Sequence, residues 1–272
     1  MQFFEYETKK IAYKIDNENH DKTIVLLNGI MMSIGSWDKF IPQFAKNRKV
    51  IRIDFLDQGQ SSKMSDEYGI NMQADVVLKL MDYLNVSKFD LFGISYGAHV
   101  SLITASISPK RVGKLMVFNA LTNTSNQLRD IGISWKLPAL ANNPEQFYYA
   151  SIPTIYSTDF YNNNEKWFED RKSLLLSVFT KDYLYSMARL ISSSESYDVR
   201  ENLQKITADT LVVGTTFDML TPCKFTKNIS NGIMNSKYIE IPDCGHATMY
   251  EKPNEFMSII SGFMDNDEIK II

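Results

Sequence analysis

Six short runs of apolar and β-branched residues recur along the chain, and segments with helical spacing separate most of them. The runs cover residues 23–28, 49–55, 89–94, 114–120, 210–215 and 237–242. Because few polar residues interrupt them, the runs are typical of strands that are buried on both faces, as in a parallel sheet. Helical spacing at 74–84, 98–107 and 255–264 supplies connecting helices. The alternation predicts an α/β fold with a mostly parallel central sheet flanked by helices.

Two parts of the chain depart from this alternation. Residues 1–15 alternate between apolar and polar side chains, which indicates an antiparallel hairpin at the edge of the sheet. Residues 122–200 contain many aromatic residues and no convincing pair of strands. Helical patterns within this interval cover residues 164–179 and 182–191. We therefore predict a core formed by residues 1–121 and 201–272, with 122–200 inserted as a helical cap; a second small helical domain is the alternative.

The composition restricts the class of protein. Hydrophobic residues make up 44% of the 272 residues, which allows a large core, and the net charge of −3 comes without a basic block. We therefore expect no nucleic-acid partner. The uncharged stretch 91–109 contains several serines, which favours a buried strand and helix over a membrane span. No apolar signal segment is apparent at the start, and two cysteines cannot form a disulfide framework, so we expect a cytoplasmic protein without a membrane partner.

The sequence G-I-S-Y-G places Ser95 between Gly93 and Gly97, directly after a predicted strand and before a predicted helix. A turn this sharp forces its central residue into strained backbone angles and leaves no room for side chains two positions away. It would also expose the serine hydroxyl at the carboxyl edge of the sheet, where open α/β folds bind ligands. A flexible Gly-Ser loop is the alternative, but the strand and helix on either side favour a nucleophilic serine.

A serine nucleophile needs a base, and the chain contains only three histidines. His20 lies in a polar turn, and His99 lies about one helical turn beyond Ser95, so His246, directly after the last predicted strand, is the candidate base. The base in turn needs a carboxylate that orients its ring. Asp218 follows the strand at 210–215 and is favoured over Asp243, which is only three residues from His246.

Ser95, Asp218 and His246 follow one another in the order Ser, Asp, His. The accompanying motifs are L-L-N-G-I (26–30), D-F-L-D-Q-G-Q-S (54–61), G-I-S-Y-G (93–97), G-T-T-F-D-M-L-T-P (214–222) and D-C-G-H (243–246). With these motifs the chain resembles the α/β-hydrolase superfamily over nearly its whole length, and it is similar to small soluble esterases and lactonases with a helical cap. The resemblance implies an oxyanion hole formed by the backbone N–H groups of Ile30 and Tyr96.

Several positions depart from the pattern of that superfamily. Asn28 stands where His is usual, Asp57 where Gly is usual, and Ala98 and His99 where smaller residues are usual. None of these changes removes a catalytic group, but they leave the subfamily open. Met31 and Met32, in the loop of the predicted oxyanion hole, are candidates for the lining of a substrate pocket and fit an ordinary core position equally well.

We therefore expect a serine hydrolase that cleaves a small, largely apolar carboxylic ester through an acyl-enzyme. Lactone, thioester, carbon–carbon bond or aminopeptidase chemistry is the alternative within this class, and a ligand receptor with slow turnover is the alternative outside it. We expect no cofactor and no metal, because G-I-S-Y-G-A does not match the dinucleotide-binding motif and the histidines are scattered. The expected partner is a small-molecule substrate, and the expected state is a monomer or homodimer.

Overall fold

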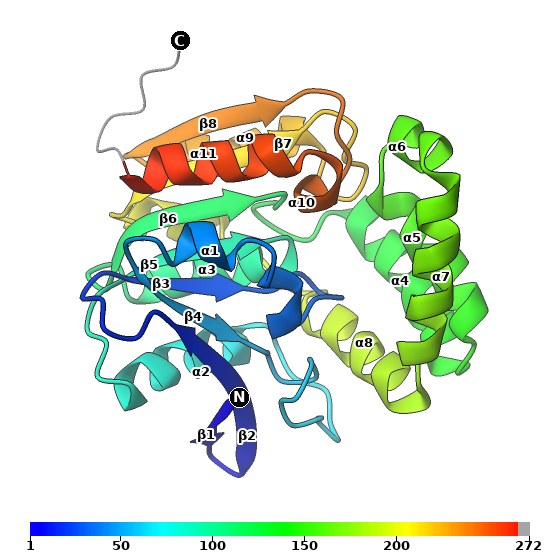
Figure 1. The fold of residues 1–272 in the computed structure, drawn as a ribbon, viewed down its shortest axis with the longest axis horizontal. Coiled ribbons are helices and arrows are strands. Elements are labelled where there is room, and N and C mark those ends of the chain that lie inside the picture. Colours follow the sequence, from blue (N-terminus) through cyan, green and yellow to red (C-terminus); the bar gives the residue numbers. More distant parts are fainter. Residues whose placement is uncertain (266–272) are drawn as a thin grey trace.

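The computed structural model describes residues 1–265, and the last seven residues of the predicted core, 266–272, lie outside the described part. Eight strands form a single sheet in the order β1-β2-β4-β3-β5-β6-β7-β8 (Figure 1). The strands are β1 (Gln2–Tyr6), β2 (Lys9–Asp16), β3 (Thr23–Leu27), β4 (Lys49–Ile53), β5 (Phe89–Ile94), β6 (Val112–Phe118), β7 (Asp209–Thr215) and β8 (Ser236–Ile241).

The strand directions confirm the predicted α/β class. Strands β3 to β8 pair only in parallel with one another, while β1 and β2 form an antiparallel hairpin that joins the sheet through β4. The predicted runs coincide with the six parallel strands to within two residues at each end. The prediction succeeds because a strand that is buried on both faces leaves an almost unbroken apolar run in the sequence.

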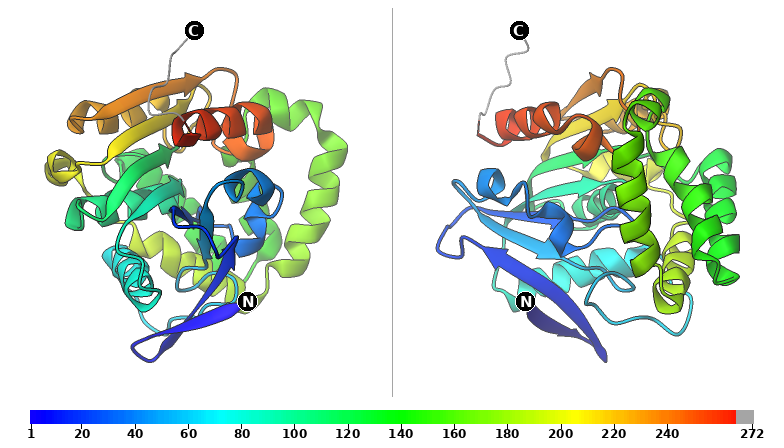
Figure 2. Two further views of the ribbon diagram at one scale, coloured as in Figure 1. Left: turned by 60° about the vertical axis from the view of Figure 1, so that its left-hand side comes forward. Right: turned by 45° about the vertical axis from the view of Figure 1, so that its right-hand side comes forward.

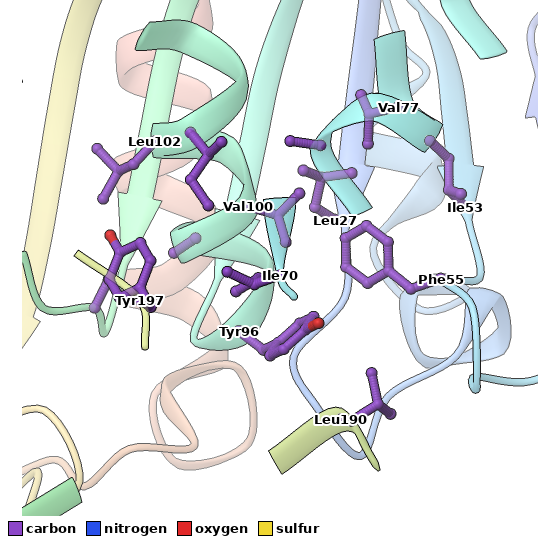
Figure 3. Packing of buried hydrophobic residues seen from close by; sticks show 14 of the residues in the cluster. Leu27, Ile53, Phe55, Ile70, Val77, Tyr96, Val100, Leu102, Leu190 and Tyr197 are labelled. Carbon is purple, nitrogen blue, oxygen red and sulfur yellow. The ribbon is translucent and has the colours of Figure 1, made fainter. Parts of the chain in front are cut away.

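Helices cover both faces of the sheet and divide its side chains into two cores. One face packs against α2 (Asn71–Tyr83), α3 (Tyr96–Ile107) and α9 (Cys223–Gly232), and the other packs against η1 (Ile34–Trp37), α1 (Ile41–Phe44) and α11 (Pro253–Asp265). Successive residues of a strand point to opposite faces, so Leu27 belongs to the first core and Leu26 to the second. Figure 3 shows the first core, where Val100 of α3 packs towards Leu27.

Five α-helices lie between β6 and β7. They are α4 (Asn126–Leu140), α5 (Pro144–Ile155), α6 (Thr158–Asn163), α7 (Glu165–Val178) and α8 (Lys181–Ser193). They gather beyond the carboxyl ends of the parallel strands (Figures 1 and 2). Of these helices, α7 and α8 match predicted segments, whereas the sequence patterns did not resolve α4, α5 and α6. Shorter helices, η2 (Arg200–Lys205) and α10 (Thr248–Glu251), follow later in the chain.

Aromatic side chains hold this helical layer together. The Tyr156 ring contacts Phe168 at a centroid distance of 5.0 Å, and Phe160 contacts Trp167 at 5.6 Å. Most of these contacts are edge-to-face, an arrangement that stabilises aromatic pairs beyond the burial of their area. Many of the aromatic residues of the insertion therefore serve its internal packing. Within residues 1–265, no helix is long and apolar enough to cross a bilayer.

Candidate active site

Ser95 lies at a sharp turn between β5 and α3. Its φ and ψ are 54° and −121°, a strained conformation for a residue with a side chain. A Cβ atom at Gly93 would lie 2.3 Å from the Gly97 carbonyl oxygen, and a Cβ at Gly97 would lie 2.3 Å from the Leu27 carbonyl oxygen. Both glycines are therefore required by close backbone approach, as the sharp-turn interpretation predicts. The alternative of a flexible Gly-Ser loop is wrong.

The structure brings Ser95, His246 and Asp218 together, although 151 residues separate the first two in the sequence. His246 Nε2 lies 2.8 Å from Ser95 Oγ, and His246 Nδ1 lies 2.7 Å from Asp218 Oδ2. Each residue follows the carboxyl end of a parallel strand: Ser95 follows β5, Asp218 follows β7 and His246 follows β8. Parallel strands thus deliver three distant segments to one edge of the sheet.

Asp218 is buried and its carboxylate is fully engaged. Its oxygens accept hydrogen bonds from the Leu220 and Thr221 N–H groups at 2.9 and 2.8 Å, and from Asn119 Nδ2 at 3.0 Å. Burial by itself raises the pKa of Asp218, but the charge of His246 and the hydrogen bonds from His246 and Thr221 together lower it. An ionised Asp218 can accept a hydrogen bond from the Nδ1–H group of His246, and this tautomer leaves Nε2 as an acceptor for the Ser95 hydroxyl.

The other acid–base candidates lie in different surroundings. His20 is exposed, and Asp243 occupies a turn with a φ of 51°, where its N–H donates to Thr216 Oγ1. His99 is buried against Tyr197, with ring centroids 4.2 Å apart, and its Nε2 accepts a hydrogen bond from the backbone N–H of Leu121 at 3.3 Å. Burial, aided by the nearby charge of His246, lowers the pKa of His99 to about 3. His99 is therefore neutral near pH 7 and faces the cavity as an uncharged ring.

Ile30 and Tyr96 line the same cavity as Ser95. Within the described residues, neither backbone N–H donates to another protein group. The Ile30 loop is held from below by Gln58, whose Nε2 donates to the carbonyls of Gly29 at 2.9 Å and Ile30 at 3.1 Å. Both N–H groups are therefore available to donate to a ligand, and the hydrogen bonds from Gln58 fix the backbone of the Ile30 loop. Gln58 was not singled out from the sequence, although it belongs to the 54–61 motif.

Asn28 replaces the usual His without loosening this loop. Its side chain accepts a hydrogen bond from Trp37 Nε1 at 2.7 Å and donates one to the Ile53 carbonyl at 2.8 Å. All three residues are buried. The amide therefore ties the end of β3 to β4 and to η1, which explains how the loop tolerates the change of residue type.

The cavity above Ser95 has a volume of about 410 Å³, a size that suits a small-molecule ligand. Met31 and Met32 line it and also pack against the two cores of the sheet. Side chains from α4, α5, α7 and α8 complete the wall, and most of them are apolar. The wall also contains Arg129, Arg171 and Glu195, which the sequence analysis did not assign to the pocket.

Asp57, another departure from the superfamily pattern, ties the core to the helical layer. Its carboxylate is fully buried and accepts hydrogen bonds from Arg189 Nε of α8 at 3.1 Å to each oxygen. The Arg189 Nη2 atom contacts the same carboxylate at 2.5 Å. Asp57 also adopts a φ of 69°, a value that explains why glycine is usual at this position.

The fold and the geometry at Ser95 define an α/β protein with a serine at a strand-to-helix elbow. Comparison with known proteins assigns the family. The family profile described as "alpha/beta hydrolase fold" matches residues 22–151. A solved α/β-hydrolase enzyme from a Medee basin deep-sea metagenome library is 38% identical, with a TM-score of 0.95 over 99% of both chains. The chain therefore belongs to the α/β-hydrolase family.

Two curated relatives show the range of chemistry in this family. The chain is 23% identical to the pyrrolizixenacetamide deacetylase of Xenorhabdus hominickii, over 96% of each chain. It is 26% identical to the 2-hydroxy-6-oxononadienedioate/2-hydroxy-6-oxononatrienedioate hydrolase of Escherichia coli strain K12, over 90% of this chain and 87% of the relative. These relatives are hydrolases, and at this identity their substrates are not transferable.

Proposed function

We propose that the protein is a serine hydrolase that cleaves a small, largely apolar carboxylic ester through an acyl-enzyme. One observation carries the proposal. A continuous chain of contacts runs from Ser95 Oγ to His246 at 2.8 Å and on to Asp218 at 2.7 Å, inside a mostly apolar cavity. The N–H groups of Ile30 and Tyr96 face the same cavity as donors for an oxyanion.

In the proposed reaction, Ser95 Oγ attacks the ester carbonyl carbon while His246 Nε2 removes the hydroxyl proton. The carbonyl π electrons move to oxygen, and the N–H groups of Ile30 and Tyr96 stabilise the oxyanion. The intermediate collapses, the alcohol leaves with the proton from His246, and Ser95 is acylated. A water molecule then repeats the sequence, with His246 as base, and releases the carboxylic acid. Asp218 keeps the His246 ring oriented and balances its charge in both halves.

The domain assignment belongs to the same proposal. Residues 122–200 are proposed to be a cap domain on a core of 1–121 and the chain from 201 onward. Two observations support this proposal. Helices α4 to α8 lie over the carboxyl ends of the strands (Figure 1), and side chains from α4, α5, α7 and α8 form part of the cavity wall. A roof of this kind excludes water and strengthens the electrostatic interactions beneath it.

The proposed setting is cytoplasmic, with a small-molecule substrate and a monomeric or homodimeric protein. Cys223 and Cys244 are both unpaired, which fits a reducing compartment. The main alternative within the class is the hydrolysis of a lactone, a thioester or a carbon–carbon bond by the same serine. The relatives favour keeping bonds other than simple esters in view, because one is named an acetamide deacetylase and the other a hydrolase of an oxo-dienedioate.

The test combines active-site labelling with turnover. Wild type, Ser95→Ala and the control Ser106→Ala are treated with a fluorophosphonate and analysed by intact mass. Ser106 lies on the same helix, where its hydroxyl donates to the Ile103 carbonyl. We expect a single adduct on wild type and on Ser106→Ala, none on Ser95→Ala, and a loss of p-nitrophenyl butyrate turnover of about 10⁴-fold or more in Ser95→Ala.

Labelling that persists in Ser95→Ala would refute the assignment of the nucleophile. A wild-type protein that takes no label and turns over no ester would favour the receptor alternative. A panel of lactones, thioesters and amides, assayed beside the esters, then distinguishes among the bonds that the same nucleophile could cleave.

A further inference from the structure

Arg171 of α7 brings a positive charge into the wall of the cavity above Ser95. Its guanidinium carbon lies 4.9 Å from the centre of the Trp167 ring and 4.5 Å from the centre of the Tyr250 ring. Tyr250 belongs to α10, which begins two residues after His246. Arg171 is therefore held between the helical layer and the segment that carries the histidine, on the His246 side of the cavity.

Arg171 differs from the other inward-facing arginines because no carboxylate compensates its charge. Arg52 pairs with Asp16, and Arg189 pairs with Asp57. Among residues 1–265, no carboxylate oxygen lies within 4.0 Å of the Arg171 nitrogens, and its buried Nε has no hydrogen-bond partner. Removing a charge from water without a counter-charge is costly, so such a group calls for an explanation.

Two tyrosine hydroxyls are the polar groups that interact with the Arg171 guanidinium. They belong to Tyr156 and Tyr250, both of which line the cavity. Burial raises the pKa of Tyr156, so this hydroxyl stays protonated and adds no negative charge. Glu195, a carboxylate in the same cavity wall, is already paired with Lys136 at 2.5 Å. The cluster therefore presents one net positive charge and two tyrosine hydroxyls in the cavity wall.

We propose that Arg171, with the hydroxyls of Tyr156 and Tyr250, binds a free carboxylate carried by the substrate, so that the preferred ester is a monoester of a dicarboxylic acid. This inference rests on the proposed esterase function, and it adds a charged group to an otherwise apolar substrate. A guanidinium edge matches the two oxygens of a carboxylate. The single positive charge fits a carboxylate better than a doubly charged phosphate, and the mostly apolar lining of the cavity suits a methylene spacer.

A purely structural role is the competing explanation. The contact of Arg171 with Tyr250 links α7 to α10, and cation–π contacts stabilise such links. These ring contacts supply no counter-charge, however, and they leave the buried Nε without an acceptor. The two explanations differ in substrate dependence: a structural link affects all esters alike, whereas a carboxylate site affects only the charged ones.

The experiment compares monomethyl and dimethyl esters of the dicarboxylic acids from succinate to suberate. Each pair has the same chain length, and the monomethyl ester carries a free carboxylate where the dimethyl ester carries a second methyl ester, so rates are compared per ester group. Hydrolysis is followed by pH-stat with wild type, Arg171→Met, Arg171→Lys and the control Arg200→Gln. Arg200 carries the same charge on the surface, where it pairs with Asp198 outside the cavity. Thermal unfolding of each variant verifies that it is folded.

We expect wild type to prefer the monomethyl ester by about 10-fold or more in kcat/KM at the best chain length, as a hydrogen-bonded charge pair predicts. Arg171→Met should lose about 10- to 100-fold on that ester and less than about threefold on the dimethyl ester. Arg171→Lys should keep part of the preference, and Arg200→Gln all of it. Equal losses on both esters, or no preference at any chain length, would overturn the inference.

A binding measurement separates this inference from the esterase proposal. Calorimetry with Ser95→Ala, which cannot turn the ligand over, measures the affinity for the monomethyl and dimethyl esters. Tighter binding of the monomethyl ester that disappears in Ser95→Ala/Arg171→Met supports the carboxylate site even if wild type hydrolyses neither ester. Hydrolysis of both esters at equal rates, with equal affinities, supports the esterase and refutes the carboxylate site.

Discussion

Breaking the ion pair between Asp57 and Arg189 should destabilise the protein strongly, and removing both partners should not. The Asp57 side chain is fully buried, and the Arg189 side chain is 18% exposed. Arg189→Met removes the guanidinium and leaves a buried carboxylate whose remaining interactions are with the Met64 N–H at 3.1 Å, the Tyr68 hydroxyl and the charge of Lys63. The loss of one partner from a buried pair typically costs about 3–5 kcal/mol. At about 2–4 °C per kcal/mol, the melting temperature should fall by roughly 6–20 °C.

The double variant Asp57→Gly/Arg189→Met tests the origin of this cost. It removes the stranded carboxylate together with the guanidinium, and glycine adopts the φ of 69° at position 57 without the strain that a side chain causes. That strain is about 1–2 kcal/mol, so the double variant should lie within about 1 kcal/mol of wild type. Asp57→Gly alone should cost less than Arg189→Met, because the released guanidinium can turn towards solvent.

Urea and thermal unfolding of the four proteins complete the cycle. The prediction requires a coupling free energy of about 2 kcal/mol or more between the two positions. Additive effects of the two single changes would refute the reasoning, because they would mean that the desolvated carboxylate does not depend on Arg189 for its stability.

Three further changes test other parts of the structure. Asp218→Asn should lower kcat/KM for p-nitrophenyl butyrate by about 10⁴-fold, because an amide no longer fixes the histidine tautomer; a loss below tenfold would argue against its orienting role. Gly97→Ala places a Cβ 2.3 Å from a carbonyl of β3 and should cost about 1–3 kcal/mol in urea unfolding, whereas the control Gly262→Ala, with nothing within 4 Å, should cost nothing. Folding lowers the pKa of His99 from 6.5 to about 3, so the unfolded chain binds a proton at this residue more readily than the folded protein does. The contribution of the neutral, buried His99 to stability is therefore complete above pH 6.5 and is lost as the pH falls towards 3. Between pH 7 and 4, the melting temperature should therefore fall less in His99→Phe than in wild type.

The strands and the serine, histidine and aspartate could be predicted because each depends on a local pattern. The run 89–94 is apolar because β5 is buried on both faces, and the glycines beside Ser95 are required by the backbone of the turn itself. His246 and Asp218 could be selected because each follows a predicted strand, and parallel strands end at the same edge of the sheet. The strand order of the sheet, by contrast, left no signal that a single sequence could reveal.

The helical layer was harder to predict because its sequence signals conflict. Pro138 lies inside α4 and Pro153 inside α5, and proline disfavours a helix interior. Leu137 and Leu174 are large apolar residues that remain 62% and 61% exposed, which blurs the amphipathic pattern. Local signals mark only the starts of α4, α5 and α6, where the side chains of Ser125, Asn143 and Ser157 cap the first turns.

Charged groups in the helical layer could not be assigned at all from the sequence, because their partners are distant. Asp57 and Arg189 are 132 residues apart, and no periodicity relates them. Asp57 was recognised only as a departure from the family pattern, and the structure explains it as half of an ion pair. Arg171 lies in a helical segment rich in charged residues, where an inward-facing arginine looks the same as a solvated one.

The different surroundings of Arg171 and Arg189 bear on the role of the helical layer. Both arginines extend from this layer towards the core, so both incur a cost for leaving water. At Arg189 the chain supplies a buried carboxylate, even at the expense of a left-handed backbone at Asp57. At Arg171 the chain supplies two aromatic rings and no carboxylate, as expected if the compensating anion arrives with the ligand. The contrast within one molecule therefore favours a carboxylate-binding role for Arg171 over a purely structural one.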